Sequence, residues 1–84
     1  MDERKILQKI LPGSKNVRFA EMMALVKGFG FHLSRVHGSH HIFVHPGVLE
    51  LVNLQEVRGE AKPYQVRQFL KLIERYRLEL EVKP

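Results

Sequence analysis

Glycine and proline residues divide this chain into short segments, and this punctuation limits what the chain can fold into. The breaks fall at Pro12-Gly13, Gly28 to Gly30, Gly38, Pro46-Gly47, Gly59 and Pro63. Because both residues interrupt regular structure, each segment between two breaks has room for one helix or one strand. A length of 84 residues fits a single domain with a small core. With 44% hydrophobic and 27% charged residues, the composition indicates a globular rather than a disordered chain.

Three segments have the apolar spacing of amphipathic helices, at residues 3–11, 18–27 and 63–76. Their apolar positions are Ile6, Leu7, Ile10 and Leu11, then Phe19, Met22, Met23 and Val26, and finally Val66, Phe69, Leu70 and Ile73. We expect Asn16 to cap the second helix and Gly28 to end it. Pro63 opens the third helix, where a first-turn proline loses no helical hydrogen bond.

Three further segments, at residues 31–36, 40–45 and 49–54, have the pattern of strands. A turn over residues 36–39 joins the first two, and we expect a polar loop over residues 55–62. Residues 78–82 alternate apolar and acidic side chains, which indicates a short edge strand or an extended tail. Short turns favour an antiparallel sheet, and we expect both longer helices to cover one face of it.

The composition excludes several classes of function. The chain has no cysteine, which rules out disulfides, thiolate catalysis and cysteine-based zinc sites. No apolar run is long enough for a membrane span, and the first residues lack the apolar stretch of a signal peptide. We therefore expect a cytoplasmic protein without a membrane partner. The net charge of +5, with a pI near 9.9, favours nucleic acid or an acidic protein as the partner.

Four of the five histidines lie within nine residues, at His37, His40, His41 and His45. A metal site would need three or four of these imidazoles to converge, but strand alternation separates His40 from His41. A second interpretation treats them as polar residues of a half-exposed strand. Phe43 is the expected core anchor, so His40 should project from the open face of the sheet.

His40 therefore has a third interpretation, as a general acid or base at a phosphodiester. Histidine titrates nearest to neutral pH, which suits proton transfer from a ribose 2′-hydroxyl. That hydroxyl is an internal nucleophile, so no metal or other cofactor is required. Gly38 permits positive φ, and Ser39 adds a hydroxyl beside it. Exposed N–H groups of this turn could hold a phosphate.

These residues resemble a known family, the HicA toxins of bacterial toxin–antitoxin pairs. The resemblance is carried by Gly30-Phe31, Arg35-Val36, Gly38-Ser39-His40-His41-Ile42-Phe43 and His45-Pro46, with Lys62-Pro63, Val66 and Leu70 in the last helix. It extends from about Arg18 to Tyr76. The order of elements that the motif requires agrees with the order read from periodicity.

The resemblance implies an α+β fold like that of a double-stranded-RNA-binding domain. Its three-stranded antiparallel sheet would carry two main helices on one face, in the order α-β-β-β-α, with a short extra N-terminal helix. We expect an N-terminal extension over residues 1–15, the HicA-like domain over 16–77, and a C-terminal tail or short edge strand over 78–84. The family's loop after the third strand is rich in basic residues, whereas this chain has Glu56 and Glu60 there.

The same resemblance implies an endoribonuclease that cleaves mRNA without a metal and inhibits translation. It also implies a HicB-type antitoxin protein that covers the active site. The family's essential histidine corresponds to His40, and Gly38 and Ser39 correspond to supporting positions of the motif.

Basic residues supply the expected grip on the RNA backbone. They are Arg35, Lys62, Arg67 and Lys71, with Gly38 and Ser39 at the turn. Water, His37 or Lys62 could serve as the second acid–base group. The alternative function is a non-catalytic RNA-binding or protein-interaction module of the same fold, which would tolerate the loss of His40.

Overall fold

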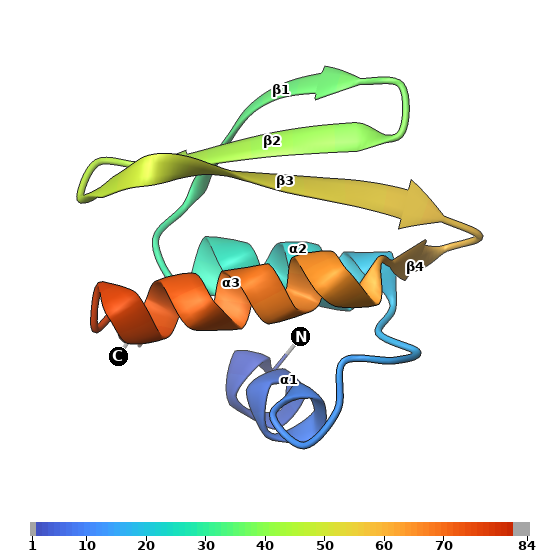
Figure 1. The fold of residues 1–84 in the computed structure, drawn as a ribbon, viewed down its shortest axis with the longest axis horizontal. Coiled ribbons are helices and arrows are strands. Elements are labelled where there is room, and N and C mark those ends of the chain that lie inside the picture. The colour runs from blue at the N-terminus through green and yellow to red at the C-terminus, as the bar shows by residue number, and fades with distance from the viewer. Residues whose placement is uncertain (1, 82–84) are drawn as a thin grey trace.

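The computed structural model describes residues 2–81, and within them the chain folds as three layers. The elements are α1 (Glu3–Ile10), α2 (Phe19–Gly28), β1 (His32–His37), β2 (His40–His45), β3 (Val48–Val57), β4 (Glu60–Ala61) and α3 (Pro63–Arg75). The strands form one antiparallel sheet in the order β1-β2-β3-β4. Figure 1 shows α2 and α3 side by side beneath one face of this sheet, and α1 on the far side of the helix pair. The expected α+β architecture, with two main helices on one face and a short N-terminal helix, is confirmed.

The helix boundaries follow local chemistry with one exception. α3 begins at Pro63 as expected, and Tyr76 is its C-cap. The expected Asn16 cap of α2 is wrong, because Arg18 is the N-cap and Asn16 has a left-handed backbone with φ 61°. Instead, the side chain of Glu21 reaches back and accepts a hydrogen bond from the Arg18 N–H at 3.1 Å.

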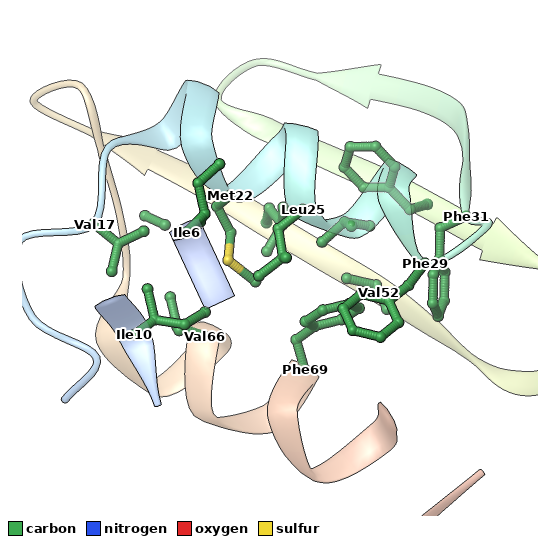
Figure 2. Close-up of a cluster of buried hydrophobic side chains, with 14 of the residues drawn as sticks. Ile6, Ile10, Val17, Met22, Leu25, Phe29, Phe31, Val52, Val66 and Phe69 are labelled. Carbon is green, nitrogen blue, oxygen red and sulfur yellow. The ribbon is translucent and has the colours of Figure 1, made fainter. Parts of the chain in front are cut away.

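The core lies between the sheet and the α2–α3 pair (Figure 2). Phe43 and Val52 enter it from the sheet, and Met22 enters it from α2. The ring of Phe69 on α3 meets the rings of Phe29 and Phe31 in edge-on contacts, with centroids 5.7 and 5.6 Å apart. One face of the sheet therefore packs against the helices, and the other face of the sheet lies outside the core.

Helix α1 is part of this core rather than a loose appendage. Ile6 and Ile10 are buried, and they meet Met22 and Val66 on the side of the helix pair away from the sheet (Figure 2). Lys9 Nζ donates to Glu21 Oε1 at 2.8 Å, which links α1 to α2. This hydrogen bond holds the pKa of the Glu21 carboxyl below its ordinary value.

The polar loop expected over residues 55–62 is wrong, and a fourth strand takes its place. β3 continues to Val57, and Glu60–Ala61 turns back to pair with it as β4. The Ala61 N–H donates to Val17 O at 2.9 Å, so β4 is held by the segment that enters α2. Residues 78–81 form no strand, and residues 82–84 lie outside the described part of the chain. Among residues 2–81, no helix has both the length and the apolar character needed to cross a membrane.

Candidate functional site

The two faces of β2 have opposite surroundings. His41 and Phe43 point toward the helices, where the His41 ring packs edge-on against Phe19 with centroids 4.8 Å apart. His45 packs against Phe31 at 4.9 Å. Because successive side chains of a strand alternate in direction, His40 projects from the outer face, which no helix covers (Figure 1). This placement of His40 agrees with the expectation from alternation.

Strand pairing gathers polar side chains around His40 on this outer face. His37 of β1 and Gln55 of β3 are the residues directly opposite His40, one on each side. Residues opposite each other in an antiparallel pair share a face. Ile42, the next residue of β2 that faces outward, lies opposite Arg35 of β1 on one side and Asn53 of β3 on the other.

Lys62 lies just past the end of β4, at the same end of the sheet as the row of His37, His40 and Gln55. Glu56 pairs with Ala61 in the last rung of the β3–β4 ladder. Lys62 follows Ala61 beyond the ladder as the N-cap of α3, and its Nζ lies 5.9 Å from the centroid of the Tyr64 ring. The structure therefore brings Arg35 and Lys62 to the same end of the sheet as His40.

The Gly38-Ser39 turn places His40 at the first position of β2, at one end of the sheet. Gly38 has φ +58°, as expected for the first turn position of a two-residue hairpin that favours glycine. A Cβ added at Gly38 would meet no atom within 4 Å, so the turn backbone is open to a ligand. Two hydrogen bonds tie Ser39 to β3, from Gln55 Nε2 to Ser39 Oγ at 3.3 Å and from the Glu56 N–H to Ser39 O at 3.0 Å.

The orientation of the His40 ring is set by Asn53. His40 Nδ1 lies 3.2 Å from Asn53 Oδ1. An amide oxygen can only accept a hydrogen bond, so the imidazole donates from Nδ1. In the neutral ring this leaves the Nε2 lone pair free, and Nε2 can then take a proton from a bound hydroxyl.

The histidines of β1 and β2 do not converge on a common point. His41 and His45 stack on core aromatics, whereas His40 bonds to Asn53 on the opposite face. Within residues 2–81, no group of three or more His, Cys, Asp or Glu side chains is placed to hold a metal ion. His41 and His45 are half-buried residues of β2, and their rings also pack against core aromatics.

Arg67 and Lys71 lie away from His40. Both line a depression between α3 and the α1–α2 connection, on the helical side of the molecule. Lys71 also borders a second hollow between β3 and α3. Of the expected RNA-binding residues, Arg35, Gly38 and Ser39 lie near His40, and Lys62 lies two strands away at the same end of the sheet, whereas Arg67 and Lys71 lie on the helical side.

Sequence reasoning missed Asn53 and Gln55 as parts of the site. Both alternate outward with Leu51 on β3, a signal that was visible in the sequence. Their contact with His40 and Ser39 depended on the β2–β3 register, which the apolar pattern alone did not define.

Comparison with known proteins gives one match. The family described as HicA toxin of bacterial toxin-antitoxin matches residues 19–74, which is two thirds of the chain and runs from the start of α2 to the last turn of α3. No curated protein and no solved structure matches the chain. The matched range includes the Gly38-Ser39 turn, His40 and Asn53, and it leaves α1 outside.

Proposed function

Because the chain belongs to the HicA family of toxins from bacterial toxin–antitoxin systems, we propose that it is an endoribonuclease that cleaves mRNA without a metal and so blocks translation. Toxins of this family are in general mRNA-cleaving interferases. The observation that carries the proposal is the His40–Asn53 contact, which orients an imidazole with Nε2 free on an uncovered sheet face. The cytoplasm, where mRNA is translated, is the proposed place of action.

His40 acts as the general base in the proposed reaction. Its Nε2 removes the proton from a ribose 2′-hydroxyl, and the resulting oxygen attacks the adjacent phosphorus. The bond between phosphorus and the 5′-oxygen then breaks. The products are a 2′,3′-cyclic phosphate and a 5′-hydroxyl, and the internal nucleophile makes a metal-bound water unnecessary.

His37 is the proposed general acid that protonates the leaving 5′-oxygen. It lies directly opposite His40 in the β1–β2 ladder, and opposite side chains have Cβ atoms about 5 Å apart. Lys62 is two strands away at the same end of the sheet and so lies farther from the leaving group. A base and an acid together produce a bell-shaped pH profile. Loss of His37 should remove one limb of that profile.

The phosphate is held by the positive charge and the backbone at this end of the sheet. Arg35 lies opposite Ile42 on the same face as His40, Lys62 follows β4 at the same end of the sheet, and the open N–H groups at Gly38 and Ser39 offer hydrogen bonds to phosphate oxygens. Arg67 and Lys71, on the helical side, contribute long-range attraction rather than contacts to the scissile phosphate.

A HicB-type antitoxin is the proposed inhibitor, and the outer face of the sheet is its proposed contact surface. Leu49 is 95% exposed and Leu51 is 57% exposed there, beside Asn53 and His40. An exposed apolar area next to polar site residues is typical of a protein-binding surface. A partner seated on it would block access to His40.

The test compares the purified wild-type chain with His40→Ala and with His32→Ala on a labelled mRNA fragment. His32 is the matched control, because it is an exposed histidine of the same outer face but lies at the other end of β1. We expect His40→Ala to lose about 10²–10⁴-fold in rate, the usual contribution of a positioned general base. We expect His32→Ala to cleave normally, and EDTA to leave cleavage intact. Unchanged cleavage by a folded His40→Ala would contradict the proposal and favour a binding module.

A further inference from the structure

A groove of about 280 Å³ lies between β3 and α3, and its β3 side borders the outer face that carries His40. Its floor is apolar and includes the buried side chains of Val52 and Phe69. Lys71 and Arg75 of α3 stand on one rim, and Leu51 and Asn53 of β3 form the other. A strand and a helix therefore form its two walls, as Figure 1 shows for the course of β3 along α3.

The wall that β3 contributes is a free sheet edge. Within β3, the described pairing with β4 involves Glu56 and Val57, so β4 covers just the end of β3. The next backbone N–H, that of Gln55, points away from β2 and donates to Gln65 Oε1 at 2.7 Å. A side chain of α3 thus closes the ladder at one end of the groove.

Beyond Gln55 the edge is open. Backbone groups of alternate strand residues point the same way, so the N–H and C=O of Asn53 and Leu51 share the direction of the Gln55 N–H. Val52 and Leu54 lie between them and pair with Phe43 and His41 of β2. Among the turn, loop and side-chain hydrogen bonds of residues 2–81, none involves the backbone N–H of Leu51 or Asn53, and the β2–β3 register turns the Asn53 backbone away from β2. Unpaired edge groups of this kind are a template for another strand.

We propose that this groove binds an extended, acidic segment of a partner protein, which adds to the sheet as a strand along β3. The free N–H and C=O groups of Leu51 and Asn53 would pair with the backbone of the segment. Alternate side chains would enter the apolar floor over Val52 and Phe69. Binding of a peptide between a strand edge and a helix by strand addition is a recurring mode of recognition.

The charges around the groove favour a partner segment of negative charge. Lys71 has no ion-pair partner within residues 2–81. The one acidic lining residue, Glu50, is neutralised by Arg75 at 2.6 Å and by a hydrogen bond from the Tyr76 hydroxyl. The hydrogen bond from the Tyr76 hydroxyl is the main cause that holds the pKa of Glu50 below its ordinary value, and a backbone hydrogen bond and Arg75 act in the same direction. The groove therefore offers a net positive rim, within a chain of net charge +5, to an acidic segment.

A peptide fits these features better than an RNA strand does. The free edge presents donors and acceptors at the two-residue repeat of a strand, which the backbone of an extended peptide matches and a sugar-phosphate backbone does not. The floor is lined by aliphatic and aromatic side chains with no ring exposed as a stacking platform, since Phe69 is buried. The groove proposal does not depend on RNA cleavage.

The binding experiment uses the full chain with His40→Ala, which can be prepared whether or not the protein is toxic. The probe is a ten-residue capped peptide in which glutamate alternates with valine and threonine, and a second peptide has lysine in place of glutamate. Amide NMR spectra follow the titration. We expect the acidic peptide to shift the Leu51 and Asn53 amides and slow their hydrogen exchange. The lysine peptide should bind at least about tenfold more weakly, which corresponds to 1.4 kcal/mol.

Three further variants locate the contact. Leu51→Pro removes the N–H that faces the groove, at an edge position where proline does not disturb the β2–β3 ladder. Leu51→Ala keeps the N–H and is its matched control. Lys71→Glu reverses the rim charge, and Lys5→Glu makes the same change at an exposed position outside the groove. We expect Leu51→Pro and Lys71→Glu to weaken binding at least about tenfold, with the two controls close to the parent.

Several results would overturn the proposal. One is that the Leu51 and Asn53 amides do not shift at millimolar acidic peptide, and another is that the lysine peptide binds equally well. A third is that Lys71→Glu binds the acidic peptide as tightly as the parent. The Lys71→Glu measurement remains informative if Leu51→Pro does not fold. Shifts of the same amides by a single-stranded RNA but not by the peptide would assign the groove to RNA. Concentration-dependent shifts without peptide would assign it to a second copy of the chain. All are read from NMR shifts, so failure here is distinct from failure of RNA cleavage.

Discussion

Replacing Asn53 with alanine removes the group that orients His40 and leaves His40 itself in place. In the wild-type chain, Asn53 Oδ1 accepts from His40 Nδ1 at 3.2 Å and leaves Nε2 free for the substrate. In Asn53→Ala the ring can rotate, and the hydrogen can reside on either nitrogen. The variant therefore separates the orientation of the imidazole from its presence.

The expected size of the effect follows from the free energy of one hydrogen bond. A bond of this kind contributes about 0.5–1.5 kcal/mol net, so the rate constant for cleavage, kcat/KM, should fall by about 2–13-fold. His40→Ala should cost about 10²–10⁴-fold because it removes the base itself. The double variant should be no slower than His40→Ala, since Asn53 acts only through His40.

The assay measures cleavage of a labelled mRNA fragment as a function of pH, with Leu49→Ala as the control. Leu49 lies on the same face of the same strand and is almost fully exposed. Asn53 is also exposed, so the loss of this one bond should lower the free energy of unfolding by no more than about 0.5–1.5 kcal/mol, and Asn53→Ala should stay folded in the assay. The reasoning is refuted if Asn53→Ala cleaves as fast as the wild type, or if it slows cleavage further in the His40→Ala background.

The remaining predictions concern the framework of the site and are read by urea unfolding. Gly38→Ala should lower the free energy of unfolding by about 1–2 kcal/mol, because φ is +58° there, and a change below 0.3 kcal/mol would contradict this. Ile10→Ala should cost about 2–5 kcal/mol because Ile10 is fully buried, whereas Leu11→Ala, at a residue 61% exposed, should cost little; equal losses would show that α1 is not part of the core. Glu21→Gln keeps the acceptor for Arg18 but removes the charge that Lys9 pairs with. Because the folded-state pKa of Glu21 is lowered, the wild type should be more stable by up to about 1 kcal/mol at pH 7 and should lose that advantage as the pH falls below 4.5, the ordinary value of a glutamate. A difference that persists at low pH would exclude the ion pair as its cause.

The parts of the fold that depend on local pattern could be predicted from the sequence. The apolar spacing that includes Val66 and Phe69, together with Pro63 at the start, predicted α3. The alternation around Phe43 predicted that His40 faces away from the helices. In each case one physical signal, the burial period or a backbone restriction, decides the outcome without reference to distant residues.

The parts that depend on tertiary pairing could not be predicted in the same way. β4 has two residues, and its pairing with β3 and the hydrogen bond from Ala61 to Val17 define it rather than its own propensity. The His40–Asn53 contact needs the β2–β3 register. Arg67 and Lys71 were grouped with His40 on charge alone, but α3 presents them to the α1–α2 connection.

The central claim is that the 2′-hydroxyl of the substrate is the nucleophile that His40 deprotonates. The direct test maps a cleavage site in an mRNA fragment and repeats the reaction on the same fragment with a single 2′-deoxy nucleotide on the 5′ side of the cleaved bond. The account predicts that cleavage stops at that bond alone, and that the unmodified fragment yields a 2′,3′-cyclic phosphate and a 5′-hydroxyl. Cleavage of the deoxy-substituted bond at the normal rate would contradict it.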